Sequence, residues 1–261
     1  MLAGTAEGPR HDAEKFRGGT RVDNHSQGDE SHAGAEHFCR IIKSSYGDLG
    51  SATHVLIAGC GRGHEALHIR RKLDVRVTGV DVAEHWDPLE TWAANIPDFE
   101  LQTSSVQDLP FPDDTFDMVF FHHVIEHVTD PAESLRELAR VLRPGGIIYV
   151  GTPNRHRAIG YLGSFDATPL QKVQWNLTDY KARFSGRFRN EYGAHAGFTE
   201  RELAALMGRF FVDLRVLTGD YLRFKYEKKL PGTILRAVCS NGLREFAAPS
   251  VYFVAYTPVI S

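Results

Sequence analysis

The sequence predicts an α/β fold in which helices cover both faces of a doubly wound, mostly parallel sheet. From about residue 53 onwards, short apolar segments alternate with longer segments of helical periodicity, which is the pattern of βαβ units. The first apolar segment breaks into closely spaced glycines, as at a tight turn from a strand into a helix. A chain of 261 residues has room for one large domain of this kind with insertions.

Seven segments have the length and composition of strands, and helices are expected between them. The strands are expected at 54–58, 75–80, 99–103, 116–121, 147–150, 211–217 and 251–256. The helices are expected at 31–46, 62–72, 88–95, 131–142 and from 199 onwards. Asp130 before Pro131 is a good helix start, and Thr199 with Glu202 forms a capping box.

Three segments lie outside this alternation. Residues 1–30 contain almost no apolar side chains and are expected to form a flexible tail, although 16–25 folding over a cofactor or partner is the alternative. The remainder, 31–261, is expected to be one domain with lid insertions at 151–198 and 219–250. Lysine and arginine exceed the acids in both insertions, giving net charges of +4 and +3. These lids are either solvated surfaces or attract an anionic acceptor.

Bulk properties exclude several classes of protein. The formal net charge of −3 argues against a nucleic-acid partner, and 42% hydrophobic residues is ordinary for a soluble protein. No apolar segment approaches the roughly 18 residues of a membrane span, and no signal sequence is evident, so we expect no membrane partner. The three cysteines form neither a disulfide framework nor a zinc pattern, which favours the cytoplasm.

The glycine turn is the most informative motif. Gly59, Gly61 and Gly63 follow the first predicted strand, and Cys60 between them is expected to contribute its backbone. Such a turn before a helix lets the backbone approach a nucleotide-like cofactor closely. The second strand is followed by Asp81, 22 residues after Gly59, where a carboxylate can accept hydrogen bonds from ribose hydroxyls.

Further motifs complete a recognisable series. Residues 104–128 contain Ser-Ser-Val-Gln-Asp-Leu-Pro and His-His-Val-Ile-Glu-His-Val, and 142–146 read Leu-Arg-Pro-Gly-Gly. With the glycine turn and Asp81, they resemble the class I S-adenosylmethionine-dependent methyltransferases, most nearly the branch that O-methylates small molecules, such as the ubiquinone-pathway enzymes. The resemblance covers about 31–218. It implies a Rossmann-like, seven-stranded sheet with an antiparallel last strand and S-adenosylmethionine as cofactor.

The resemblance also assigns cofactor contacts. It places the glycine turn against the methionine part of the cofactor and Asp81 at the ribose. The positions implied to bind the cofactor are Gly59, Cys60, Gly61, Gly63, Asp81, Val82, Ser105, Val106, Gln107 and His122. Two positions depart from the family pattern, since Ser105 and Ile57 stand where acids are common.

Two histidines are the candidates for acceptor activation. His122 and His123 end the fourth strand, so that one should face the cofactor and the other the acceptor. An alcohol or phenol must lose a proton during methylation, and we expect His123 and His127 to serve this purpose. A purely structural role for either histidine is the alternative.

A metal site is a second possibility. Some relatives by resemblance bind a divalent ion through Glu-x-x-Glu-His and a later histidine. Here the corresponding residues are His123, Glu126, His127 and His195, a set that suits zinc, manganese, iron or cobalt better than magnesium. The metal would lower the pKa of the acceptor oxygen and replace the free base.

The expected function is therefore methyl transfer from S-adenosylmethionine to a hydroxyl of a small molecule, a sugar or natural product. Neutral and anionic acceptors both remain open. The alternatives are metal-dependent methylation of RNA ends or another anionic acceptor, N-methylation of an amine, and a non-catalytic binding subunit. A homodimer is an open possibility.

Overall fold

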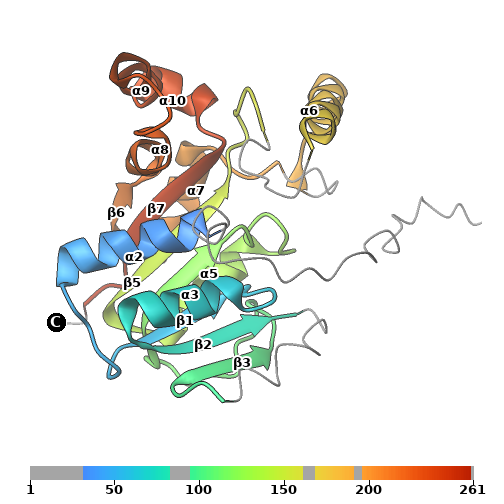
Figure 1. Ribbon diagram of the computed structural model, residues 1–261. Coiled ribbons are helices and arrows are strands. Elements are labelled where there is room, and N and C mark those ends of the chain that lie inside the picture. The colour runs from blue at the N-terminus through green and yellow to red at the C-terminus, as the bar shows by residue number, and fades with distance from the viewer. Residues whose placement is uncertain (1–31, 83–94, 161–167, 191–195, 260–261) are drawn as a thin grey trace, which may run out of the picture.

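A computed structural model describes residues 32–82, 95–160, 168–190 and 196–259 (Figure 1). The expected tail at 1–30 lies outside these residues, as does the helix expected at 88–95 except for Asn95. His195, one of the four residues of the predicted metal site, also lies outside them.

The described chain contains a seven-stranded sheet in the order β3-β2-β1-β4-β5-β7-β6. The first five strands are parallel, and β7 runs antiparallel to both of its neighbours. The predicted fold class is confirmed, including the antiparallel last strand. The strands are β1 (His54–Ala58), β2 (Arg76–Asp81), β3 (Phe99–Thr103), β4 (Phe116–His122), β5 (Leu142–Pro153), β6 (Val212–Val216) and β7 (Ser250–Tyr256).

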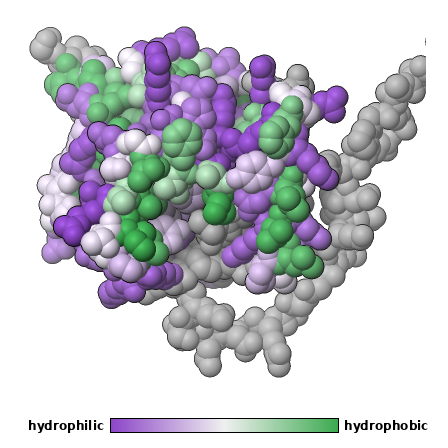
Figure 2. Space-filling view, turned by 90° about the horizontal axis from the view of Figure 1, so that it is seen from above, coloured by the Kyte–Doolittle hydropathy of each residue, from purple (hydrophilic) through white to green (hydrophobic). Residues whose placement is uncertain are grey.

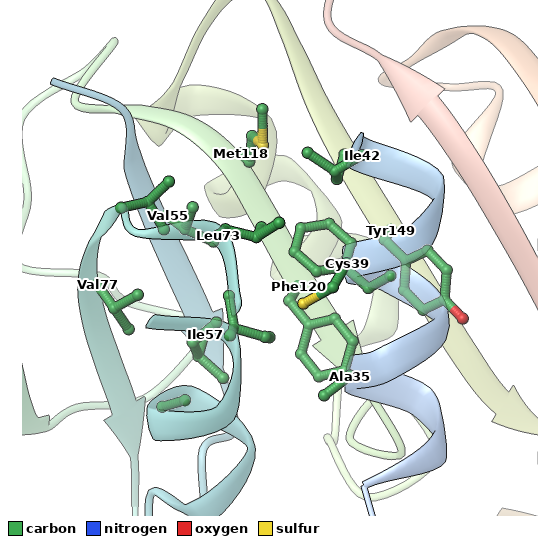
Figure 3. Close-up of a cluster of buried hydrophobic side chains, with 14 of the residues drawn as sticks. Ala35, Cys39, Ile42, Val55, Ile57, Leu73, Val77, Met118, Phe120 and Tyr149 are labelled. Atoms are coloured by element: carbon green, nitrogen blue, oxygen red, sulfur yellow. The ribbon is translucent and has the colours of Figure 1, made fainter. Parts of the chain in front are cut away.

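Helices cover both faces of the sheet, and each face has its own apolar core. On one face, α2 (Ala33–Tyr46) and α3 (His64–Leu73) pack on the strands. Figure 3 shows Phe120 and Tyr149 of the sheet against Ala35 and Cys39 of α2. Alternate residues of the same strands face the second core, which includes residues of α5 (Pro131–Val141) and α7 (Glu200–Met207). This alternation explains why the strands read as continuous apolar segments.

The predicted helix starts agree with the structure. The Asp130 carboxylate accepts hydrogen bonds from the backbone N–H groups of Ala132 and Glu133 at the start of α5. Thr199 and Glu202 form both bonds of a capping box at the start of α7. The helix after the glycine turn begins at residue 64, two residues later than predicted, because Gly63 has a left-handed φ of 76°.

The fifth strand is longer than predicted at both ends. The sequence at 143–146 predicted a turn that would delay the strand until residue 147, but β5 begins at Leu142, which pairs with Phe116. The register shifts between this pair and the next, Met118 with Ile147, and Gly145 has a φ of 74°. The glycines therefore form an irregularity within the strand rather than a turn before it.

Both insertions are helical where they are described. The first contains α6 (Pro169–Phe184), and the second contains α8 (Thr218–Tyr226), α9 (Gly232–Val238) and α10 (Asn241–Ala247). The buried Asn154 at the end of β5 joins them, because its side-chain amide donates to the carbonyls of Glu245 and Ala248. Among the described helices, none is long and apolar enough to cross a membrane.

Candidate functional site

The glycine turn lies directly after β1 and is held close to the neighbouring strands. The backbone N–H groups of Gly59 and Cys60 both donate to the carbonyl of Val80 on β2. A Cβ at Gly59 would lie 2.1 Å from a methyl carbon of Val124, so no larger residue fits there without a shift. A Cβ at Gly61 would meet nothing within 4 Å. The turn is therefore packed on one side and open on the other, as a cradle for a ligand requires.

Asp81 lies beside this open side at the end of β2. Its carboxylate accepts a hydrogen bond of 2.7 Å from the backbone N–H of Gly61. Val82, the next residue, is 68% exposed. The structure thus brings the predicted ribose-binding carboxylate and the glycine turn together.

Cys60 and Val106 have buried side chains. Burial, together with the charge of Asp81, raises the pKa of the Cys60 thiol well above its ordinary value, so this cysteine is not a thiolate nucleophile. The Val106 side chain packs in the core beneath the β3–β4 connection. Only the backbones of these two residues are available to a ligand.

Ser105 and Gln107 shape the connection after β3. The Ser105 hydroxyl accepts a hydrogen bond from the backbone N–H of Gln107. The side-chain oxygen of Gln107 in turn accepts from the backbone N–H and the hydroxyl of Thr129. Gln107 therefore links the predicted adenine side of the site to the loop that follows β4.

His122 points towards the face covered by α2 and α3. Its ring fills the space left by two glycines, because a Cβ at Gly34 or at Gly151 would lie 2.3 Å or 2.6 Å from a ring atom. Its Nδ1 lies 3.4 Å from the Glu65 carboxylate. Burial lowers the pKa of His122 despite the attraction of that carboxylate, so the ring is neutral. Nε2 is buried and has no hydrogen-bond partner among the described residues.

His123 turns the other way and carries a strained backbone. Its φ of 55° is unusual for a residue other than glycine, a feature that clusters at functional sites. The side chain is 40% exposed, and Nδ1 lies 3.3 Å from Oε1 of Glu126. In the tautomer whose Nδ1–H donates to this carboxylate, Nε2 carries the lone pair that a base requires.

Glu126 is the buried anchor of this histidine. Its second oxygen accepts a 2.9 Å hydrogen bond from the hydroxyl of Thr152 on β5. Burial acts to raise the pKa of Glu126, but the hydrogen bond and charge of His123 outweigh it, and the pKa lies below its ordinary value. His127 is half-exposed, and its Nε2 lies 3.9 Å from the same carboxylate. The structure thus assembles a carboxylate flanked by two histidines.

The predicted metal site is not assembled in the described part of the chain. His123, Glu126 and His127 are neighbours, but no three His, Cys, Asp or Glu side chains among the described residues converge to hold an ion. The fourth predicted ligand, His195, is outside those residues. The metal site stays a prediction.

The sequence did not predict three of the residues that contact His122 or Glu126. Glu65 beside His122, Thr152 beside Glu126 and the glycine at 34 that admits the His122 ring come from elements distant in sequence. Thr152 follows the strand predicted at 147–150, but nothing near it in the sequence indicates that it pairs with Glu126.

The residues present fit S-adenosylmethionine. The glycine turn leaves open space at Gly61, Asp81 is adjacent to it, and the buried, unpartnered Nε2 of His122 lies at the same strand edge.

Comparison with known proteins gives a domain match. Residues 56–150 match the family described as "Methyltransferase domain". This range includes the glycine turn, Asp81 and the histidines after β4.

Curated relatives match over the same part of the chain. A Mycolicibacterium smegmatis protein named "Probable S-adenosylmethionine-dependent methyltransferase" is 40% identical over 101 residues, 39% of this chain and 38% of its own. The 27-O-demethylrifamycin SV methyltransferase of Amycolatopsis mediterranei is 32% identical over 107 residues, 40% and 39% of the two chains. Ajmaline N-methyltransferase of Rauvolfia serpentina is 31% identical over 101 residues, 37% and 35%. The match thus spans well under half the length of these relatives.

A solved structure extends the likeness in fold. It is a Haemonchus contortus phosphoethanolamine N-methyltransferase in complex with S-adenosyl-L-methionine, with a TM-score of 0.53 and 17% identity. The alignment covers 85% of this chain and 52% of that one.

Proposed function

Because the chain contains a class I S-adenosylmethionine-dependent methyltransferase domain, we propose that it transfers a methyl group from S-adenosylmethionine to a hydroxyl of a small molecule. The observation that favours oxygen over nitrogen as the methyl acceptor is the His123–Glu126 pair, which lies at the strand edge beside the glycine turn. An oxygen acceptor needs a base, whereas a neutral amine does not.

The proposed roles divide between the two sides of the site. The glycine turn holds the methionine part of the cofactor, and Asp81 accepts hydrogen bonds from the ribose hydroxyls. The bound cofactor supplies an activated methyl group, so the protein has mainly to align the acceptor and exclude water. Nε2 of His123 takes the acceptor proton, and the Glu126 carboxylate stabilises the imidazolium that results.

His127 and the lids complete the proposal. His127 is a second base candidate, since its ring lies beside the same carboxylate and is half-exposed. The basic lids favour an acceptor that carries a phosphate or carboxylate, and a sugar or natural-product hydroxyl is the leading class.

N-methylation is the second candidate. Relatives of similar identity include both an N-methyltransferase and a methyltransferase that acts on an oxygen, so sequence likeness does not separate them. A metal-assisted reaction through His123, Glu126, His127 and His195 is a third candidate, and a chelator distinguishes it from a free base.

The test is transfer of a labelled methyl group from S-adenosylmethionine to a panel of hydroxyl and amine acceptors, by the wild type and by His123→Ala. We expect transfer to a hydroxyl that falls by about 10²-fold in the variant and is unaffected by chelator. Transfer only to amines, unchanged in His123→Ala, would contradict the O-methylation. Loss of activity with chelator would favour the metal.

A further inference from the structure

Helix α6 presents its apolar side to solvent. Five large apolar side chains follow one another at intervals of three and four residues, and so form one stripe along the helix. All five are exposed, with Leu170 at 67% and Phe184 at 91%, and the Tyr180 hydroxyl also donates a hydrogen bond to the carbonyl of Ala158. The stripe consists of Leu170, Val173, Leu177, Tyr180 and Phe184.

The side of α6 that faces the protein is polar. The buried Asp179 forms an ion pair of 2.7 Å with the buried Arg157. Asn176 accepts a 2.7 Å hydrogen bond from the backbone N–H of Gly160, and Arg183 donates to the carbonyl of Arg157. An ordinary surface helix has the opposite arrangement, with its apolar stripe towards the core. The polar contacts fix α6 with its stripe outward, which leaves an apolar surface without a partner in the described structure.

The segment that contains α6 is strongly basic. Asp179 is the only acid between residues 168 and 190, and it is neutralised by Arg157. The basic residues of this segment are Lys172, Lys181, Arg183, Arg187 and Arg189. An occupant of this surface must therefore combine apolar groups with negative charge.

A second exposed apolar group lies at the same end of the molecule. It consists of Ile159, Ile234, Leu243 and Phe246, on and next to α9 and α10. Figure 2 looks onto this end and shows apolar residues over α6 on the right and over α9 and α10 on the left, each among hydrophilic residues. We call the α6 stripe and this second group together the lid face.

The charge of the whole chain is strongly divided. The two insertions carry +4 and +3, so that with a total of −3 the rest of the chain carries −10. Such an asymmetry directs the basic end of a protein towards an anionic surface.

We propose that the lid face docks on an anionic lipid surface, with α6 lying in the membrane interface. Lipids offer an apolar interior for the stripe and negative headgroups for the flanking lysines and arginines. A second copy would place one basic helix against another, and a nucleic acid would leave the stripe uncovered. The earlier expectation of no membrane partner rested on the lack of a spanning segment, which a peripheral contact does not need. The proposal does not depend on the methyl-transfer reaction.

The experiment is sedimentation of the full chain with phosphatidylcholine vesicles, with and without phosphatidylglycerol, at increasing salt. We expect binding to the anionic vesicles that weakens with salt, and much weaker binding to phosphatidylcholine alone.

Two matched pairs of variants locate the contact. Val173→Asp on α6 should reduce binding by about tenfold or more, whereas Val212→Asp on the edge strand β6, also at an exposed valine, should not. Arg187→Glu should reduce binding to anionic vesicles by about tenfold, whereas Arg71→Glu on α3 should not. Unchanged circular dichroism shows that each variant folds.

Three outcomes would overturn the proposal. The first is that the protein sediments with neither kind of vesicle, and the second is that the two variants of a pair reduce vesicle binding equally. The third is that the protein binds no vesicles but forms a dimer in analytical ultracentrifugation, which Val173→Asp dissociates. Titration of the same protein with S-adenosylhomocysteine reports cofactor binding separately, so failure of one proposal does not imply failure of the other.

Discussion

At the scale of single residues, the chemistry of the site rests on a buried carboxylate with a histidine beside it. Glu126 is shielded from water, yet the imidazole of His123 and the hydroxyl of Thr152 satisfy its oxygens. Sequence reasoning placed both histidines at the strand end, because the periodicity of the fourth strand ends there. It did not find Thr152 or Glu65, because side-chain contacts between elements far apart in sequence leave no local pattern.

Replacing Glu126 by Gln should remove the negative charge beside His123. We expect kcat for a hydroxyl acceptor to fall by about 10–100-fold, because a neutral amide cannot stabilise the imidazolium, while the KM for the cofactor changes little. The matched control is Glu137→Gln, another buried glutamate, which is held by Arg140 on α5. It should lower stability and leave kcat unchanged. An equal loss of kcat in both variants would argue against the anchor role.

Replacing Gly61 by Ala should affect cofactor binding more than folding. Its φ of 51° strains any side chain by about 1 kcal/mol, but a Cβ there meets no protein atom within 4 Å. We expect affinity for S-adenosylhomocysteine to fall by about tenfold or more, because the methyl group projects into the open side of the turn. Gly186→Ala is the control, because Gly186 has a φ of 69° and a Cβ there also meets nothing within 4 Å. This variant carries similar backbone strain but lies away from the glycine turn, so it should bind S-adenosylhomocysteine as tightly as the wild type. Equal affinities of the two variants would contradict this use of the glycine turn.

At the scale of elements, the parallel strands were predictable, whereas the helices within the two insertions were not. Apolar segments of strand length and the caps at Asp130 and Thr199 are local signals, and the structure agrees with them. The apolar residues of α6 carry no local sign of facing outward, since the same spacing is typical of a buried face. Their orientation follows from polar contacts with Arg157 and Gly160, which only the folded chain brings together.

Asp179→Asn should loosen α6 without unfolding the sheet. The Asp179–Arg157 ion pair is buried, and breaking such a pair costs about 3–5 kcal/mol locally. Limited proteolysis should therefore cleave residues 168–190 faster in the variant. Asp220→Asn provides the control, because the Asp220–Arg223 pair is exposed and contributes about 0–1 kcal/mol. Unaltered cleavage of Asp179→Asn would mean that other contacts hold the helix.

At the scale of the whole molecule, three histidines that the fold buries wholly or in part should make it sensitive to mild acid. Burial, together with the charge of Arg40, lowers the pKa of His37 to about 3, and burial together with the charge of Arg76 lowers that of His54 to about 4. Burial also lowers the pKa of His122. Below pH 6.5 these residues take up protons in the unfolded chain but not in the folded one, so the free energy of unfolding falls as the pH falls.

Urea unfolding at pH 7 and at pH 5 measures this effect. We expect a lower midpoint at pH 5, with His37 alone contributing about 2 kcal/mol between pH 6.5 and 5. His37→Asn should make the difference between the two pH values smaller. Equal midpoints at both pH values in the wild type would show that these histidines are not held neutral.

Calorimetric titration with S-adenosylhomocysteine tests the central claim most directly, since every proposed step requires the cofactor beside the glycine turn. The account predicts one-to-one binding with a Kd on the order of 10 μM, and binding at least tenfold weaker in Asp81→Ala, which removes the charged acceptor for the ribose hydroxyls. No detectable binding by the folded wild-type protein would contradict the account and leave a non-catalytic subunit in its place.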